Sequence, residues 1–305
     1  MAERPLGHID ADRFKATLSP EAYANLMAAT AQSARDAGHF VVLGQQDELP
    51  PQETIAAFAK GLDLDPYSAR QRLIAPTPRI LRREENKEAA DRWVAWMRAL
   101  ELRGFRLSER AFSQFHPIEV VSYKIDRSGV TFEIDNGRCE TVPAEEVLCI
   151  VQGTVRSRDV QEIEKKDFLI GSAYGGHETV RVNRETRIDI HLAGVALIFR
   201  LSQSHLRFGD IFPGRQIASD VMMREVAGQI RGAYAALPLR DDFARASEIL
   251  GQSWKIASKT TDFRYSAFNT TPFGAGIRNN RVTQESDEET FDLYSLLSRM
   301  QLIMM

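Results

Sequence analysis

Residues 40–44 read Phe-Val-Val-Leu-Gly and open a stretch, residues 40–107, that we expect to fold as a complete small α/β unit. The first four residues are apolar and rich in β-formers, which predicts a buried strand. After a proline-rich loop, apolar side chains recur at the spacing of one helix face. These side chains are Ile55, Phe58, Ala59 and Leu62.

Two more helices and two more strands complete the stretch. Asp65 followed by Pro66 predicts a second helix start, because the carboxylate caps free N–H groups and proline fits the first turn. A short extended segment, residues 79–81, precedes Asn86, which caps the longest helix, and Gly104 ends that helix. A last strand follows, so the expected order is strand, helix, helix, strand, helix, strand.

Short motifs lie along the strands and helices of this stretch. They are Phe40-Val41-Val42-Leu43, Gly61-Leu62-Asp63-Leu64, Ala69-Arg70, Ala75-Pro76, and Ala89-Ala90 with Gly104. Together with the order of elements, they resemble the C-terminal domain of the bacterial ribosomal stalk protein. That family has Gly-Leu-Gly-Leu, Ala-Lys and Ala-Pro where this chain has the second, third and fourth motifs. The resemblance covers about a fifth of the chain.

The resemblance implies a docking module that binds partner proteins and has no active site of its own. Asp63 replaces the second glycine of the family's turn, and a basic helix start is replaced by Asp65-Pro66-Tyr67. A stalk-like dimerisation region at the N-terminus has no counterpart. The resemblance therefore implies the fold and a docking role but no ribosomal role. The candidate partner-binding residues here are Asp65, Tyr67, Arg70 and Arg72.

From Pro117 onward, short runs alternate between apolar and polar residues, as strands with one buried face do. Asp135-Asn136-Gly137 predicts a hairpin turn, and an amphipathic helix follows over Ser219–Leu237. This pattern predicts an antiparallel β-sandwich or barrel closed by a helix, and its order resembles a pleckstrin-homology-like barrel. The expected later strands cover residues 147–151, 168–170, 180–182, 187–192, 195–201 and 205–208.

We therefore expect an α+β chain in four parts. They are an N-terminal arm and helix (1–38), the stalk-like docking domain (39–112), the β-domain (117–238) and a C-terminal α/β extension (239–305). The extension ends in an amphipathic helix that packs on its own domain or offers an interface to a partner. The candidate interface residues are Leu293, Leu297, Met300 and Ile303.

Composition limits the classes of function. The 305 residues carry a net charge of −3, which shows no overall bias toward nucleic acid or an anionic membrane. No apolar run reaches the roughly 20 residues that span a bilayer, and the start lacks the pattern of a signal peptide. Cys139 and Cys149 are expected as free thiols in a cytoplasm, with a disulfide between them as the open alternative.

Two polar patterns are candidates for chemistry. The segment from Gly171 to His177 runs into a predicted strand rather than a helix, so it predicts a hairpin loop and not a phosphate cradle. Asp189 and His191 share one face of a strand, where a surface pair is favoured. An enzyme with a site near Asp189, His191 and His177 is the alternative function. Without a recurring motif, we expect no catalytic residue, no metal and no cofactor.

The densest basic stretch runs from Arg79 to Arg110, and acidic residues within it offset the charge. We expect a solvated surface with i, i+4 ion pairs, and binding of nucleic acid or anionic lipid there is a second alternative. The folds favour a non-catalytic protein-interaction or scaffold protein of a bacterial cytoplasm. Its expected partner is another protein, or a second copy bound through the C-terminal helix, rather than a membrane or nucleic acid.

Overall fold

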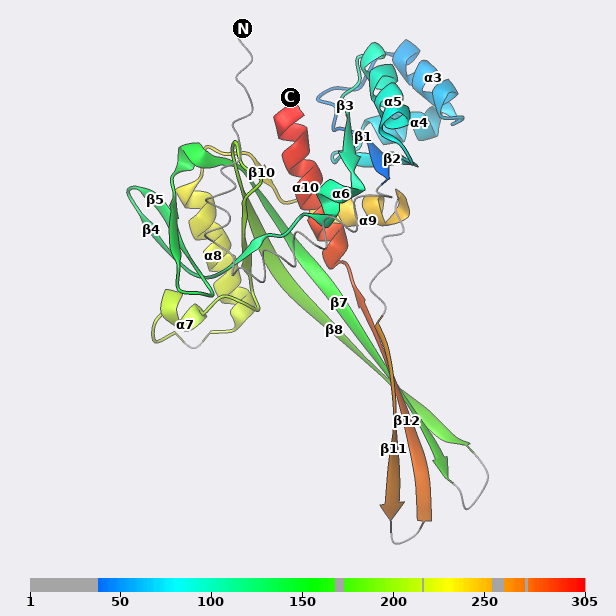
Figure 1. Ribbon diagram of the computed structural model, residues 1–305, viewed down its shortest axis with the longest axis vertical. Coiled ribbons are helices and arrows are strands. Elements are labelled where there is room, and N and C mark those ends of the chain that lie inside the picture. Colours follow the sequence, from blue (N-terminus) through cyan, green and yellow to red (C-terminus); the bar gives the residue numbers. More distant parts are fainter. Residues whose placement is uncertain (1–37, 168–172, 216, 254–260, 272–273, 305) are drawn as a thin grey trace.

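The computed structural model describes an α+β protein (Figure 1). The described residues are 38–167, 173–215, 217–253, 261–271 and 274–304, with side chains described outside 161–178 and 251–284. The helix expected at residues 19–36 and the strand expected at residues 168–170 lie outside the described residues.

The first part of the fold is a small domain with the predicted order of elements. It comprises β1 (His39–Leu43), α3 (Gln52–Gly61), α4 (Pro66–Leu73), β2 (Arg79–Glu84), α5 (Lys87–Ala99) and β3 (Gly104–Ser108). The three strands form an antiparallel sheet in the order β2-β1-β3. The predicted helix starts are confirmed, because Asp65 accepts from the Ser68 N–H at 2.9 Å and Asn86 accepts from the Ala89 N–H at 2.8 Å.

The second part is one large sheet. Its strands are β4 (Ile118–Asp126), β5 (Gly129–Ile134), β6 (Cys139–Val142), β7 (Val147–Asp167), β8 (Ala173–Leu192), β9 (Ile198–Ser202), β10 (Leu239–Arg240), β11 (Thr261–Thr271) and β12 (Gly274–Ser286). The order is β11-β12-β7-β8-β9-β4-β5-β6, with β10 beside β7. The pairing is antiparallel except for β4 with β9 and β10 with β7. The C-terminal extension therefore contributes strands to the sheet of the β-domain.

Helices cover both faces of this sheet within the body of the molecule. The predicted closing helix, α8 (Ser219–Ala233), packs against apolar side chains of β4 to β9. The remaining helical segments are α6 (Glu109–Ser113), η2 (Ala144–Glu146), α7 (Phe208–Ile211), α9 (Phe243–Ser253) and α10 (Glu288–Met304). The apolar side chains of α9 and α10 pack between the two sheets, so the body has alternating layers of helices and sheets (Figure 1).

Strand alternation assigns side chains to these layers. In β1, Val41 and Leu43 pack against α3, α4 and α5, whereas Phe40 and Val42 point to the α9 and α10 layer. Gly153 of β7 lies directly beneath this layer, because a Cβ atom there would come within 2.7 Å of both Phe243 and Phe291. The glycine therefore allows two aromatic side chains to approach the strand backbone.

Beyond the body, β7 and β8 continue as a long hairpin, and β11 and β12 lie beside it (Figure 1). We call this four-stranded part, residues 157–167, 173–186, 261–271 and 274–286, the distal ribbon. The prediction of several short strands was wrong here, because β7 has 21 residues and β8 has 20. Residues 173–177 belong to β8 rather than to the predicted hairpin loop, and residues 261–271 and 274–286 form the paired strands β11 and β12. Among the described side chains, those of residues 179–184 of β8 are exposed on both faces, so no buried face extends an apolar pattern along this part of the strand.

Candidate functional site

Asp189 and His191 are both fully buried, so the prediction of a surface pair was wrong. They lie on β8, and Ile188 and Ile190 between and beside them point to the α8 core. Strand alternation therefore turns Asp189 and His191 to the opposite face, which α10 covers. The residues that cover this face come about 100 positions later in the chain, beyond the reach of a local pattern.

A charged cluster joins β8, β9 and α10 at this position. Arg200 donates to both carboxylate oxygens of Asp189, at 2.7 and 2.8 Å, and it contacts Asp292 of α10 at 2.7 Å. Ser295 donates from its hydroxyl to the same Asp189 carboxylate at 2.6 Å. Burial alone would raise the pKa of Asp189, but the charge of Arg200 and these hydrogen bonds together hold it below its usual range.

His191 is neutral in this cluster, and the hydrogen bonds define its tautomer. The Ser295 hydroxyl hydrogen points to Asp189, so the Ser295 oxygen accepts from His191 Nε2–H at 2.8 Å. Nδ1 of His191 has no hydrogen-bond partner among the described residues. Burial lowers the pKa of His191 to about 3, which leaves the ring uncharged at neutral pH.

The cluster contains a serine, a histidine and an aspartate, but its geometry differs from a catalytic triad. The carboxylate binds Ser295 and Arg200 rather than His191, so it does not orient the imidazole as a base. Asp189 and His191 have no exposed area, and an acid–base group must reach its substrate within hydrogen-bond distance. His177 lies 14 residues from His191 on the same strand, roughly 45 Å away. The arrangement fixes α10 to the sheet.

Sequence reasoning missed three members of this cluster, namely Arg200, Asp292 and Ser295. Arg200 gave a usable signal, because it is the one charge within the apolar run from residue 195 to residue 201. A charge in a buried strand requires a buried partner of opposite sign. Neither Asp292 nor Ser295 had a comparable signal, since both lie among the polar residues of an amphipathic helix.

The predicted docking residues on α4 have two different roles. Asp65 caps the helix, so its carboxylate is already engaged by the Ser68 N–H. Tyr67 is 72% exposed, Arg70 is exposed as well, and Arg72 is half-buried. An accessible surface therefore exists on α4, formed by these last three side chains.

The predicted interface on the last helix is mostly buried within the chain. Leu293 and Leu297 are each 1% exposed and belong to the core between the two sheets. Met300 is partly buried, and Ile303 is 47% exposed. Leu293 and Leu297 are therefore not accessible to a partner in this conformation. The helical spacing correctly predicted an apolar stripe on α10. In the structure, the two neighbouring sheets cover this stripe, so no partner is needed to bury it.

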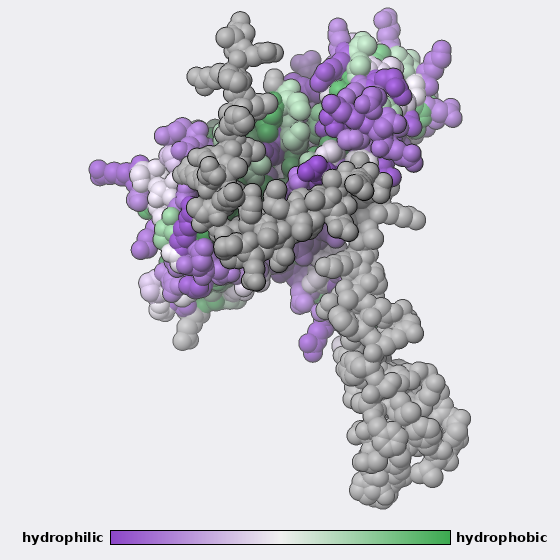
Figure 2. Space-filling model, in the orientation of Figure 1, coloured by the Kyte–Doolittle hydropathy of each residue, from purple (hydrophilic) through white to green (hydrophobic). Residues whose placement is uncertain are grey.

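The basic stretch from Arg79 to Arg110 is tied to acids on other elements. Arg83 pairs with Glu109, Arg103 pairs with Asp47, and Arg106 contacts Asp91 at 2.9 Å. These pairs join different elements, so the expectation of i, i+4 pairs along one helix was wrong for them. Figure 2 shows hydrophilic side chains over most of the visible face of the small domain. The paired charges reduce the positive field that a nucleic-acid surface requires.

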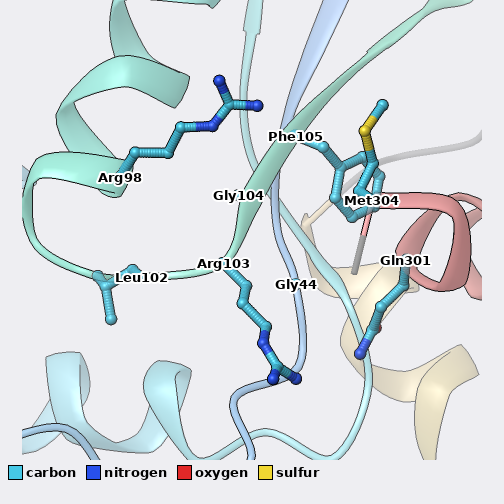
Figure 3. Close-up of a pocket in the computed structure, with 8 residues that line it drawn as sticks. All are labelled: Gly44, Arg98, Leu102, Arg103, Gly104, Phe105, Gln301 and Met304. Atoms are coloured by element: carbon cyan, nitrogen blue, oxygen red, sulfur yellow. The ribbon is translucent and has the colours of Figure 1, made fainter. Parts of the chain in front are cut away.

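A cavity of about 290 Å³ lies where the ends of β1 and β3 meet the end of α10 (Figure 3). Its side-chain lining combines Arg98, Leu102, Arg103, Phe105, Gln301 and Met304. Figure 3 shows the guanidinium groups of Arg98 and Arg103 pointing in different directions rather than at one point. A ligand site normally has polar groups that converge. None of the predicted partner-binding residues of α4 and α10 lines this cavity, whereas Arg98 and Arg103 come from the basic stretch.

The distal ribbon is a surface that the sequence did not predict. Val180 and Val182 are 44% and 56% exposed on one face, and Arg181 and Asn183 between and beside them are exposed on the other. Both faces of this part of β8 therefore lie open. Within the described residues, β8 also has no strand beyond it from residue 173 to residue 185, and β11 is the last strand of the sheet.

Comparison with known protein families, curated proteins and solved structures finds no match to this chain. The resemblances to the stalk docking domain and to the pleckstrin-homology-like barrel remain predictions. Cys139 and Cys149 are both free, the first exposed and the second buried. None of the helices in the described part of the chain combines the length and apolarity needed to cross a membrane.

Proposed function

We propose that the protein is a non-catalytic interaction or scaffold protein that binds its partner through the distal ribbon. The observation that carries this proposal is that residues 179–184 of β8 are exposed on both faces, while residues 187–192 of the same strand are buried in the body. The buried half of the strand is explained by the core of the protein. The exposed half has no role in that core, so a binding role accounts for it.

A sheet is ordinarily stabilised by burying at least one face, and isolated hairpins are marginal in water. The ribbon instead leaves Val180 and Val182 exposed. Among the described residues, its outer strands also present N–H and C=O groups that pair with no other strand, and such groups can bind an added strand. A partner that covers these groups supplies the contacts that the chain itself does not provide.

The body suits the role of a rigid base for this ribbon. The Asp189–Arg200 pair joins β8 to β9, and the contacts of Arg200 with Asp292 and of Ser295 with Asp189 attach α10. Asp287, at the junction of β12 and α10, accepts from the Arg156 N–H of β7 at 2.6 Å. The base of the ribbon is therefore held to the body through hydrogen bonds of both β7 and β8.

The strand register defines a truncation that tests this proposal. Asp159 pairs with both Arg181 and Gln284, and Gln284 pairs with Thr261, so these four residues lie at one level. Replacing residues 160–180 and residues 262–283 each by an Asn-Gly turn removes the part of the ribbon between that level and its tip. An unchanged thermal midpoint of the body confirms that the truncated chain folds.

The experiment captures partners of the tagged full chain and of the truncated chain from the native cell, then measures binding with the purified partner. We expect the truncation to weaken that binding by at least tenfold. Equal binding by both chains, or no partner for either, contradicts the proposal. A Tyr67→Ala chain is the matched variant for the α4 surface. Binding that is lost in Tyr67→Ala and kept in the truncation assigns the interaction to the small domain instead.

A further inference from the structure

We propose that the partner of the distal ribbon is a second copy of this chain. The open edge of β8 in one copy pairs with the open edge of β11 in the next. This inference rests on the proposed function, because it takes the ribbon as the binding surface. It adds the identity of the partner and the strands that meet.

The first step is that the ribbon has two open edges, one at each border. β8 pairs with β7 along its length, but it pairs with β9 only from Arg187 to His191. Residues 173–185 therefore have an open side within the described part of the chain. β11 pairs with β12 alone in that part, so its other side is open as well. Figure 1 shows β11 at one border of the ribbon and the β7–β8 hairpin at the other.

The second step is that the two open edges overlap along the ribbon. At the end nearer the body, Thr261 of β11 lies level with Arg181 of β8, through Gln284 and Asp159. Nearer the tip, Phe268 lies level with Ala173, through Ile277 and Lys166. The shared length is roughly 25 Å. Two copies placed side by side at the same height therefore bring the two open edges together over this length.

The third step is strand direction. Three successive antiparallel pairs separate β11 from β8, so these two strands run in opposite directions. Copies whose ribbons point the same way thus present β8 to β11 in the antiparallel sense, which is the pairing used throughout the ribbon. Pairing of β8 with β8 leaves both β11 edges open, whereas pairing of β8 with β11 covers both kinds of edge. Such a head-to-tail contact builds rings or filaments.

The composition of the edges agrees with pairing. Natural edge strands commonly carry lysine or proline, which prevents another strand from adding to them. Residues 173–186 and residues 261–271 contain neither lysine nor proline. Both outer strands of the ribbon therefore lack two of the residues that most often block strand addition, and their charges are of both signs.

Single cysteines at one level of the two edges test the contact. The full chain is first changed by Cys139→Ser, because Cys139 is exposed, while Cys149 is buried and stays. Arg181→Cys and Thr261→Cys are then made in separate chains and treated with a short bismaleimide, alone and mixed. Arg224→Cys on the exposed face of α8 is the matched control for random collisions. An unchanged thermal midpoint shows that each variant folds.

We expect at least tenfold more cross-linked dimer in the mixture of Arg181→Cys and Thr261→Cys than in either chain alone. A chain carrying both cysteines is expected to form a ladder of multimers. Efficient dimer formation by Arg181→Cys alone overturns the head-to-tail arrangement. A mixture that links no better than the Arg224→Cys control overturns the second copy as partner.

The two proposals fail in different ways. If the mixture does not cross-link but the truncation still loses a different captured protein, the ribbon binds that protein and only the self-pairing fails. If the truncation loses no partner and the mixture does not cross-link, both proposals fail. Sedimentation velocity of the unmodified full chain gives an independent reading. A single monomer boundary over a hundredfold range of concentration also overturns self-pairing.

Discussion

Strands β7 and β8 lie in two different environments, the body of the molecule and the distal ribbon, and they are stabilised differently in each. In the body, Val151 and Ile190 are at most 2% exposed, and helices cover both faces of the sheet. In the distal ribbon, Val180 and Val182 of β8 are exposed on one face and Arg181 on the other. The comparison teaches that the core stabilises one half, whereas the other half depends on its strand pairing and on a partner. The following variants break or sharpen this contrast.

Arg200→Leu is expected to have the largest effect, because it leaves the buried Asp189 and the half-buried Asp292 without their positive partner. Breaking a buried ion pair from one side costs about 3–5 kcal/mol of unfolding free energy. Denaturant unfolding measures this loss. Arg224→Ala is the matched control, since its pair with Asp220 is exposed, and its cost is expected within about 0.5 kcal/mol. Equal effects of the two changes contradict the role of the buried cluster.

Gly153→Ala is expected to lower the unfolding free energy by about 1–3 kcal/mol through overpacking. The added methyl group meets Phe243 and Phe291 in the layer between the sheets. Gly228→Ala in α8 is the control, because nothing lies within 4 Å of its added Cβ. That change is expected to be neutral or to stabilise the helix by up to about 1 kcal/mol. Thermal unfolding measures both variants. The same shift of the unfolding midpoint in the two would contradict the close contact of Gly153 with Phe243 and Phe291.

The body is expected to lose stability in acid partly through His191. Its pKa is about 3 in the folded chain and 6.5 when unfolded. Below pH 6.5 the unfolded chain takes up a proton that the folded chain does not, so this contribution falls by about 1.4 kcal/mol per pH unit, down to pH 3. The groups facing the ring are Ser295, Asp189, Arg200, Arg299 and Cys149.

Denaturant unfolding of the native chain and of His191→Gln between pH 7 and pH 5 isolates this group from other titrating residues. The stability advantage of the native chain is expected to shrink as the pH falls, because glutamine takes up no proton. Parallel pH curves for the two chains contradict a neutral, buried His191.

Removing the ribbon is expected to have the smallest effect on the body. The truncation at the level of Asp159 and Arg181 leaves the core clusters of the body intact. We expect the unfolding free energy of the body to change by less than about 0.5 kcal/mol. A loss of several kcal/mol in denaturant unfolding shows instead that the ribbon is part of the folding core.

The sequence predicted those parts of the fold whose signals are local. Asp65, Asn86 and the helical spacing of apolar residues gave the small domain in the correct order, because caps and periods act within a few residues. The turn at residues 135–137 and the closing helix α8 were predicted on the same basis. The α+β class followed from these elements.

The parts that were missed depend on distant contacts or on the lack of a core. Nothing near Asp189 showed that α10 would cover it, since Ser295 lies 106 residues away. The ribbon was read as short strands and loops because its polar residues fall on both faces. A strand with no buried face has no apolar period to detect. The ribbon became evident from the strand pairing in the structure, which aligns β11, β12, β7 and β8 side by side.

Hydrogen exchange of the backbone at several protein concentrations tests the central claim most directly. The account predicts that amides of residues 173–186 and 261–271 become protected as the concentration rises, since the edges of neighbouring copies then pair. Amides of residues 147–155 should exchange slowly and equally at every concentration. Ribbon exchange that does not change with concentration would contradict the claim that the ribbon edges join copies of this chain.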